Sequence, residues 1–117
     1  MRFQEELSVE YDITVSDFLI PSLTVEPLVE NAVKHGLGKK TGGGTVRIST
    51  REEPGCYKVI VEDNGVGFEP GNESRWKEDH VGIRNVKSRL KMMCDGILLT
   101  ESAPGKGTTM KIILKKE

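Results

Sequence analysis

Alternation with a period of two residues is the feature that most constrains the fold of this chain. Val46, Ile48 and Thr50 alternate with Arg47, Ser49 and Arg51, and Tyr57, Val59 and Val61 continue the pattern after the turn sequence Glu-Pro-Gly at 53–55. A period of two residues is typical of a half-buried strand, and two such runs joined by a short turn predict a hairpin. Two more strands are predicted at 97–101 and 108–114. Consecutive hairpins argue against a doubly wound parallel sheet, because each parallel neighbour needs a crossover.

Two segments between the predicted strands have apolar residues at helical spacing instead. The first runs from Leu23 to a stop near residues 36–38, and Pro21 can open it. The second covers residues 82–94, and Asp95-Gly96 ends it. The apolar positions of this second helix are Ile83, Val86, Leu90 and Met93.

One further alternating segment, residues 7–14, predicts an edge or hairpin strand. The order of elements is therefore strand, helix, two strands, helix, two strands. This order predicts an α+β fold: a two-layer α/β sandwich with a mixed sheet of about five strands and the helices on one face. With 117 residues, the chain is long enough for one domain and too short for two, so we expect residues 1–117 to form one unit.

The overall charge of the chain gives no reason to expect a polyanionic partner. Lys and Arg number 17 and Asp and Glu 18, so nothing points to nucleic acid or to an anionic membrane, and an anionic ligand must be held by local groups. No apolar stretch is long enough to cross a membrane. Cys56 and Cys94 lack the spacing of metal ligands and are expected to be reduced thiols.

A carboxylate and two glycines directly follow the predicted strand 57–61, in the sequence Asp-Asn-Gly-Val-Gly at 63–67. Glycine permits close approach to the backbone and a carboxylate accepts hydrogen bonds, so a flat ligand such as a purine could lie there. Asp-Asn-Gly after a strand is also an ordinary hairpin turn. The motif alone leaves both interpretations open.

Three other segments carry groups suited to a nucleotide. Asn31, Lys34 and His35 offer a carboxamide, an ammonium and an imidazole on one helix, the groups needed to hold Mg²⁺ and to neutralise phosphates, or a solvated surface. Residues 80–85 place a glycine at a helix N-terminus, whose free amides and dipole favour a phosphate, although such a terminus can also bind nothing. Residues 105–108, Gly-Lys-Gly-Thr, are most simply a turn between strands.

In this order and at these separations, the four segments resemble the N box and glycine boxes of the Bergerat-fold ATPases, shared by gyrases, heat-shock chaperones, mismatch-repair ATPases and histidine kinases. The sequence Glu-Asn-Ala-Val-Lys-His-Gly at 30–36, together with Gly-Ile-Arg-Asn-Val-Lys-Ser-Arg-Leu at 82–90, is similar to the catalytic domain of LytS/YesM-type sensor histidine kinases. The resemblance extends from about residue 7 to residue 114.

The resemblance implies roles for individual residues. Asn31 would ligate Mg²⁺, and Lys34 and His35 would approach the phosphates or ribose of ATP. Asp63 would accept a hydrogen bond from the exocyclic amine of adenine, and residues 68–81 match the ATP lid. The remaining nucleotide-binding positions would be Gly65 and Gly67 beside the ring, Gly82 and Ile83 at the phosphates with Asn85 fixing that turn, and Gly105, Gly107 and Thr108 at the far wall near adenine.

The resemblance has one departure. Many members of the family have a glycine at the position that His80 occupies here, so the packing around the phosphates must differ. His80 could donate a hydrogen bond to a phosphate oxygen, or it could merely cap the helix.

The reaction implied by the resemblance is phosphoryl transfer. Gyrase-type hydrolases of this fold place a catalytic glutamate four residues before the Mg²⁺-binding asparagine, and Pro27 occupies that position here. Proline cannot activate water, and Glu30 is rotated about 100° away from Asn31 in a regular helix. We therefore expect transfer of the γ-phosphoryl group to an external histidine.

The resemblance also implies a context. The phosphoacceptor histidine would lie on a dimerisation domain of the same receptor, outside this chain, and a response regulator would act after it. The chain would be the cytoplasmic, catalytic part of a membrane-bound receptor kinase, able to bind Mg-ATP but not to phosphorylate itself. Two alternatives stay open: an anti-sigma-like serine kinase of the same fold, and a nucleotide-sensing module without catalysis.

Overall fold

The computed structural model describes residues 7–15, 25–33, 44–67 and 81–116. Within these ranges the elements follow the predicted order of strand, helix, two strands, helix, two strands. Their bounds are β1 (Leu7–Ile13), α2 (Val25–Asn31), β2 (Gly44–Glu53), β3 (Cys56–Asp63), α4 (Val81–Cys94), β4 (Ile97–Ala103) and β5 (Gly107–Lys115). The segments around Pro21, at 36–38 and at 68–80, to which the sequence assigned a helix start, a helix stop and most of a lid, lie outside the described residues.

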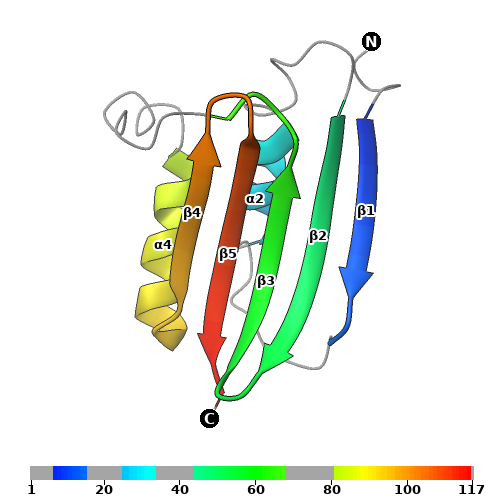
Figure 1. Ribbon diagram of the computed structural model, residues 1–117. Coiled ribbons are helices and arrows are strands. Elements are labelled where there is room, and N and C mark those ends of the chain that lie inside the picture. Colours follow the sequence, from blue (N-terminus) through cyan, green and yellow to red (C-terminus); the bar gives the residue numbers. More distant parts are fainter. Residues whose placement is uncertain (1–6, 16–24, 34–43, 68–80, 117) are drawn as a thin grey trace.

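The five strands form one mixed sheet in the order β1-β2-β3-β5-β4. β1 runs parallel to β2, and the other three pairs are antiparallel. Both helices lie on the same face of the sheet (Figure 1), so the predicted two-layer α/β sandwich is confirmed. β1 is the edge strand, and the alternative of a hairpin is wrong because α2 provides the crossover that a parallel pair requires.

The core lies between the helices and the inner face of the sheet. It is made of side chains at alternate positions of β2 to β5 and at helical spacing on α2 and α4. Burial of these side chains is the main favourable contribution to folding. The largest of them that are fully buried are Leu28, Leu90, Met110, Ile112, Val46 and Val86.

The end of α4 departs from the prediction. Val86 and Leu90 are fully buried as expected, but Met93 is 66% exposed. After the helix the chain passes beneath the last turn, where Gly96 N–H donates to the carbonyl oxygen of Leu90 at 2.9 Å and Gly96 is itself buried. Main chain therefore closes the space under this turn, and Met93 remains at the surface.

The residue that ends α4 in the left-handed conformation is Asp95, with φ of 52°, and not the glycine that follows it. Short polar side chains tolerate this region better than other non-glycine residues. The bond from Gly96 N–H to the carbonyl oxygen of Leu90 then satisfies one of the backbone carbonyl groups at the end of the helix. The predicted end of the helix at Asp95-Gly96 is confirmed, but Asp95 and not Gly96 adopts the left-handed conformation.

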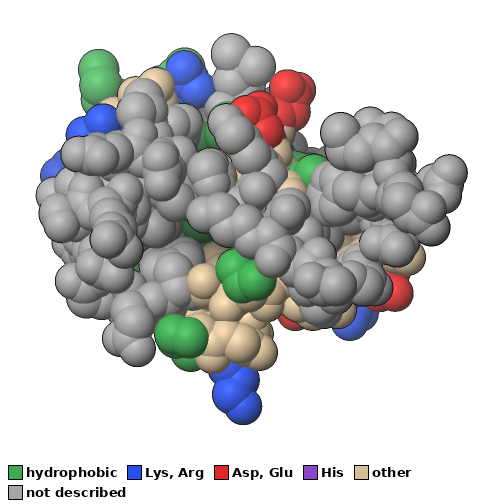
Figure 2. All heavy atoms as spheres, turned by 90° about the horizontal axis from the view of Figure 1, so that it is seen from above, with side chains coloured by type: hydrophobic (Ala, Val, Ile, Leu, Met, Phe, Trp, Pro, Cys, Tyr) green, Lys and Arg blue, Asp and Glu red, His purple; other side chains and the backbone are tan. Residues whose placement is uncertain are grey.

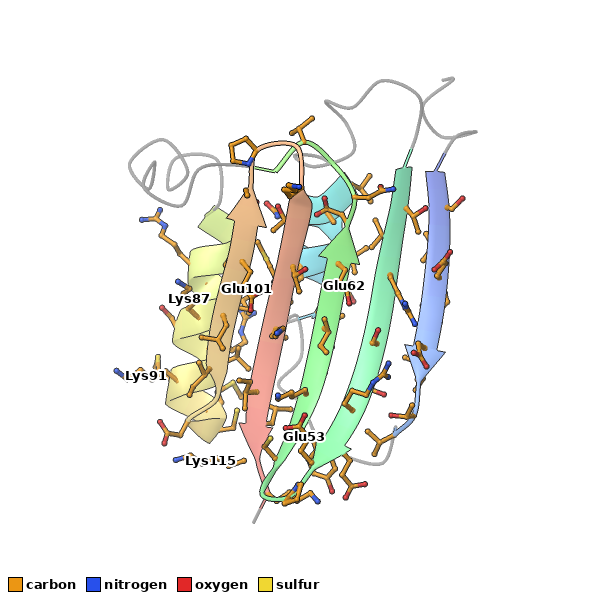
Figure 3. All side chains as sticks on the ribbon, in the orientation of Figure 1. Glu53, Glu62, Lys87, Lys91, Glu101 and Lys115 are labelled. Atoms are coloured by element: carbon orange, nitrogen blue, oxygen red, sulfur yellow. The ribbon has the colours of Figure 1, made fainter. Side chains whose placement is uncertain are left out.

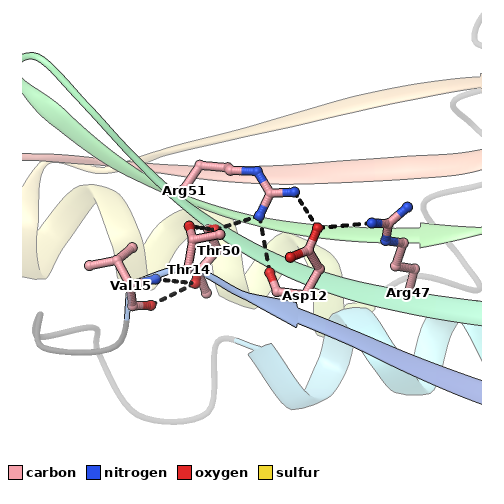
Figure 4. A network of polar contacts seen from close by, with 6 residues as sticks. All are labelled: Asp12, Thr14, Val15, Arg47, Thr50 and Arg51. Carbon is pink, nitrogen blue, oxygen red and sulfur yellow. Dashed lines mark hydrogen bonds and ion pairs between the residues drawn. The ribbon is translucent and has the colours of Figure 1, made fainter.

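β1 is fixed to the sheet by its polar residues as well as by its ladder (Figure 4). One carboxylate oxygen of Asp12 accepts from Arg47 at 2.8 Å and from Arg51 at 2.6 Å. The hydrogen bond from Arg51, followed by that from Arg47 and both positive charges, lowers the pKa of Asp12 below 3.8 in spite of opposing desolvation. Beyond the strand, the Thr50 hydroxyl donates to the carbonyl oxygen of Val15 at 2.6 Å.

The face of the sheet turned away from the helices is largely polar. Glu62 and Glu101 project from β3 and β4 on this face (Figure 3). Lys111 of β5 pairs with Glu101 at 3.2 Å. This face contrasts with the apolar inner face, so β2 to β5 each bury one side. The prediction that residues 7–14 form a half-buried strand is wrong in its burial, because Val9, Tyr11 and Ile13 of the edge strand β1 are 44%, 70% and 48% exposed.

Candidate functional site

The described parts of all four predicted nucleotide-binding segments lie at one end of the molecule. The C-terminal ends of α2 and β3, the N-terminal end of α4 and the turn between β4 and β5 meet there (Figure 1). Figure 2 looks onto this end, where the coloured neutral and hydrophobic atoms at the lower centre lie apart from the acidic side chains near the top and at the right of the view. Segments far apart in the sequence are thus brought together at one candidate site.

Asp63 is the last residue of β3, and it is 9% exposed on the same face of the strand as the core residues Val59 and Val61. Its Oδ1 accepts from Gly65 N–H at 2.8 Å, so the backbone curls around the carboxylate. β3 pairs with β2 and β5, and the next described element along the chain is α4. The alternative of a hairpin turn at Asp-Asn-Gly is therefore wrong.

Gly67 and Gly107 are glycines for a reason that the sequence did not reveal. Both have positive φ, 68° and 79°, and a Cβ atom would collide with the carbonyl oxygen of Ala103 at the first and of Asp63 at the second. Gly105 N–H also donates to the carbonyl oxygen of Val66 at 2.7 Å. The loops after β3 and after β4 are thus packed backbone to backbone. A further contact of Gly65, Gly67 or Gly105 with a purine ring stays a prediction.

Thr108 lies opposite Asp63 in the register of β3 and β5, and it is 6% exposed. Ser102 of β4 lies opposite Thr108 on its other side. Ser102 Oγ donates to the carbonyl oxygen of Gly107 at 2.9 Å and lies 2.8 Å from Thr108 Oγ1. The site therefore contains a polar row across three strands. Sequence reasoning missed Ser102, although pairing the strands across a tight turn at 104–106 would have placed it beside Thr108.

Asn64 was also missed. Its Oδ1 accepts from Thr45 N–H at 2.8 Å, and its own N–H donates to the carbonyl oxygen of Thr45 at 3.3 Å. These bonds continue the pairing of β2 and β3 one residue past Asp63, which lies opposite Val46. Asn64 thereby fixes the direction in which the chain leaves the strand.

Asn31 ends α2, and the next two residues, Ala32 and Val33, form a wider π-type turn. Such local widening of a helix is frequent at functional sites. Asn31 is 9% exposed, and its buried Oδ1 accepts no hydrogen bond within the described part of the chain. A buried carbonyl oxygen without a donor costs about 1–3 kcal/mol. Lys34 and His35, predicted beside it, lie outside the described residues.

This oxygen fits the Mg²⁺ that the resemblance implies. Mg²⁺ prefers oxygen ligands and takes few of them from the protein, completing its shell with water and substrate phosphates. In the ranges that the structure describes, no group of three or more His, Cys, Asp or Glu side chains could hold a metal ion. A cation held by Asn31 Oδ1 would therefore complete its shell with water and with oxygens of the ligand.

The N-terminus of α4 carries the predicted phosphate segment. The helix begins at Val81, so Gly82 and Ile83 belong to its first turn, and Asn85 is exposed. No acidic residue lies in that turn, so within the described part of the helix no carboxylate offsets the positive end of the helix dipole. His80 and residues 68–80 of the predicted lid lie outside the described residues. A contact of this turn with phosphates stays a prediction.

The position at which gyrase-type hydrolases carry their catalytic glutamate also lies within the described residues. Pro27 lies in the first turn of α2, where its missing N–H costs no helical hydrogen bond. Glu30 is exposed, whereas the adjacent Asn31 is buried. The predicted rotation of Glu30 away from Asn31 is confirmed.

Two other expectations can be compared with the structure. Cys56 and Cys94 are both free thiols, as expected. Among the described helices, none is long and apolar enough to cross a membrane.

Comparison with known proteins identifies the family. The model described as "Histidine kinase-, DNA gyrase B-, and HSP90-like ATPase" matches residues 18–117. The protein YwpD of Bacillus subtilis is 38% identical over 97% of this chain and 43% of its own length. The sensor histidine kinase YpdA of Escherichia coli is 35% identical over 89% of this chain and 20% of its own length. YesM of Bacillus subtilis, also a sensor histidine kinase, is 36% identical over 78% of this chain and 16% of its own length.

The chain thus spans less than half the length of these relatives. Among solved structures, the Acinetobacter baumannii histidine kinase AdeS superposes with a TM-score of 0.76 at 17% identity, over 96% of this chain and 55% of that one. This likeness shows the fold, and sensor proteins called LytS are also among the sequence relatives. The chain therefore belongs to the histidine kinase-, DNA gyrase B- and HSP90-like ATPase family, and its relatives include the sensor histidine kinases predicted from its sequence.

Proposed function

We propose that this chain binds Mg-ATP and donates the γ-phosphoryl group to a histidine on another domain of the same receptor. The observation that carries the proposal is the buried Oδ1 of Asn31, which has no partner among the described residues. Its helix ends beside the strand that bears the buried carboxylate of Asp63. One group suits a cation and the other a hydrogen-bond donor of a base.

In this proposal the protein positions the nucleotide from both ends. Asp63 accepts a hydrogen bond from the amino group of adenine, held in place by its own bond from Gly65 N–H. The first-turn amides of α4 face the phosphates. Asn31 Oδ1 holds Mg²⁺, which when bound offsets the charge that develops on the phosphate oxygens. Lys34 and His35 would add positive charge beside them, as the resemblance implies.

The chemical step is an in-line displacement. A histidine nitrogen of the acceptor domain attacks the γ-phosphorus, the bond to the bridging oxygen breaks, and ADP leaves with that oxygen. Pro27 and the exposed Glu30 offer no base beside Asn31 that could activate water in its place. The proposed reaction is therefore transfer and not rapid hydrolysis.

The wider context is part of the same proposal. Residues 1–117 would form one catalytic domain of a receptor kinase that is longer than this chain, as the sensor kinases among its relatives are. Its partners would be the phosphoacceptor domain and, indirectly, a response regulator, and it would act in the cytoplasm.

The test combines the chain with the histidine-bearing domain of its own receptor and ATP labelled in the γ-phosphate. We expect acid-labile phosphate on that domain, none on the 117-residue chain alone, and loss of transfer in Asn31→Ala. Acid-stable phosphate on a partner serine would instead identify a serine kinase. Calorimetric binding of ATP without any transfer would identify a nucleotide sensor, and absence of binding to a folded chain would refute the proposal.

A further inference from the structure

The hydroxyl groups of Ser102 and Thr108 form a hydrogen-bonded chain whose direction is set by a main-chain carbonyl group. Ser102 Oγ lies 2.9 Å from the carbonyl oxygen of Gly107, to which it donates. It also lies 2.8 Å from Thr108 Oγ1, where geometry permits either oxygen to be the donor. A hydroxyl has one proton. Because the proton of Ser102 is used on Gly107, Thr108 must donate to Ser102.

This direction determines what Thr108 can offer to a third group. With its proton engaged, Thr108 Oγ1 has only lone pairs left. Thr108 is the cross-strand neighbour of Asp63, and both residues are more than nine-tenths buried. An ionised Asp63 carboxylate also only accepts. The two neighbouring positions therefore present hydrogen-bond acceptors to a ligand and no side-chain donor.

We infer that Ser102 is a positioning residue for base selection: by accepting from Thr108, it sets the site to take an amino group and to reject a carbonyl group. The inference rests on the proposed function, which places a purine base at Asp63. Adenine carries an amino group at C6, a donor that both acceptors can use. Guanine carries a carbonyl oxygen there, which would meet two acceptors and leave buried lone pairs unpaired.

Ser102 can act in this way without touching the base. It belongs to β4, one strand beyond Thr108 and two beyond Asp63. Its own hydroxyl is held by Gly107, which cannot move without disturbing the close backbone contact with Asp63. The orientation of the Thr108 proton is thus fixed by the fold before any ligand arrives.

The test is the ratio of dissociation constants for GTP and ATP, measured by titration calorimetry on the wild-type chain and on Ser102→Ala. Removal of the acceptor frees the Thr108 proton to turn toward the ligand, so we expect the preference for ATP to fall by about tenfold. Ser102→Thr keeps the hydroxyl group and should keep the preference. Circular dichroism confirms that each variant is folded.

A second variant keeps the test decisive if Ser102→Ala does not fold. Thr108→Val removes the hydroxyl group itself and should also reduce the preference, whereas Thr108→Ser should retain it. An unchanged ratio in the folded variants, or an equal loss of affinity for both nucleotides, would overturn the inference. Failure of the wild-type chain to bind either nucleotide would instead refute the proposed function.

Discussion

The backbone of Gly107 lies against the carbonyl oxygen of Asp63 with no space for a Cβ atom between them. Because φ at Gly107 is also positive, at 79°, an alanine there would be strained in its backbone and would displace Asp63. We expect Gly107→Ala to lower the free energy of unfolding by about 2 kcal/mol more than Gly105→Ala.

Gly105 is the matched control, because its φ of 77° is nearly the same and a Cβ there would meet nothing within 4 Å. Gly105→Ala should therefore cost only the strain of the left-handed conformation, about 1–2 kcal/mol. Urea denaturation of both variants measures the difference. Equal costs would show that the contact with Asp63 relaxes freely.

Replacement of Asn31 should separate stability from ligand binding. Its buried Oδ1 accepts no hydrogen bond within the described residues, so an apolar side chain of similar size removes an unfavourable term. We expect Asn31→Leu to change the free energy of unfolding by less than about 1 kcal/mol, or to increase it. The same substitution should abolish the dependence of ATP affinity on Mg²⁺.

Denaturation without nucleotide and calorimetry with and without Mg²⁺ measure the two effects of Asn31→Leu. A loss of several kcal/mol of stability would indicate that the amide has a structural role. Retention of the Mg²⁺ dependence would remove Asn31 from the proposed metal site.

The pairing of Asp12 with two arginines predicts how stability depends on pH. The pKa of Asp12 is lowered in the folded protein, first by the hydrogen bond from Arg51. A lowered pKa means that the stabilisation is present above the unfolded value of 3.8 and is lost as the pH falls through the folded value. Asp12→Asn should therefore be less stable than wild type at pH 7, and the two should converge in acid.

Denaturation midpoints from pH 7 down to pH 3 check this prediction. Glu10→Gln is the matched control, because it removes the same charge from the same strand at a residue for which the described structure contains no ion pair. A gap between wild type and Asp12→Asn that is constant with pH would show that the ion pairs contribute nothing to it.

Asn64 should control the protection of the end of β2. Its Oδ1 accepts from the N–H of Thr45, which lies one residue beyond the ladder of β2 with β3. We expect Asn64→Ala to accelerate hydrogen exchange at the Thr45 amide by about five- to tenfold. Asn64→Asp keeps an acceptor in the same place and should exchange like wild type, whereas unchanged protection in Asn64→Ala would mean that another group takes over the bond.

The order and type of most elements could be predicted because α2, α4 and β2 to β5 each bury one face, whereas β1 alternates in sequence but exposes Val9, Tyr11 and Ile13. Alternation in β2 and β3 and helical spacing around Val86 and Leu90 report that burial directly. Met93 has the same spacing, but its exposure depends on where the chain runs after the helix, and this is set by Gly96. A periodic pattern cannot contain that information.

The site was predictable only in part for a related reason. Asp63 follows a strand, so its position at the end of the sheet could be inferred from the sequence near it. The need for glycine at Gly67 and Gly107 arises from loops that are distant in the sequence and meet only in the fold. Ser102 likewise acquires its role from the register across β4 and β5, which local residue preferences do not specify.

Pro27 in the first turn of α2 has a consequence for the lifetime of bound ATP. Its ring has no group that can take a proton from water, and the nearby Glu30 is turned to solvent. In the proposed mechanism, bound ATP is therefore not hydrolysed rapidly and stays available for transfer. The interval between successive transfers would then be set by how often the receptor brings its histidine to the domain. ATP would stay bound to the domain in the meantime.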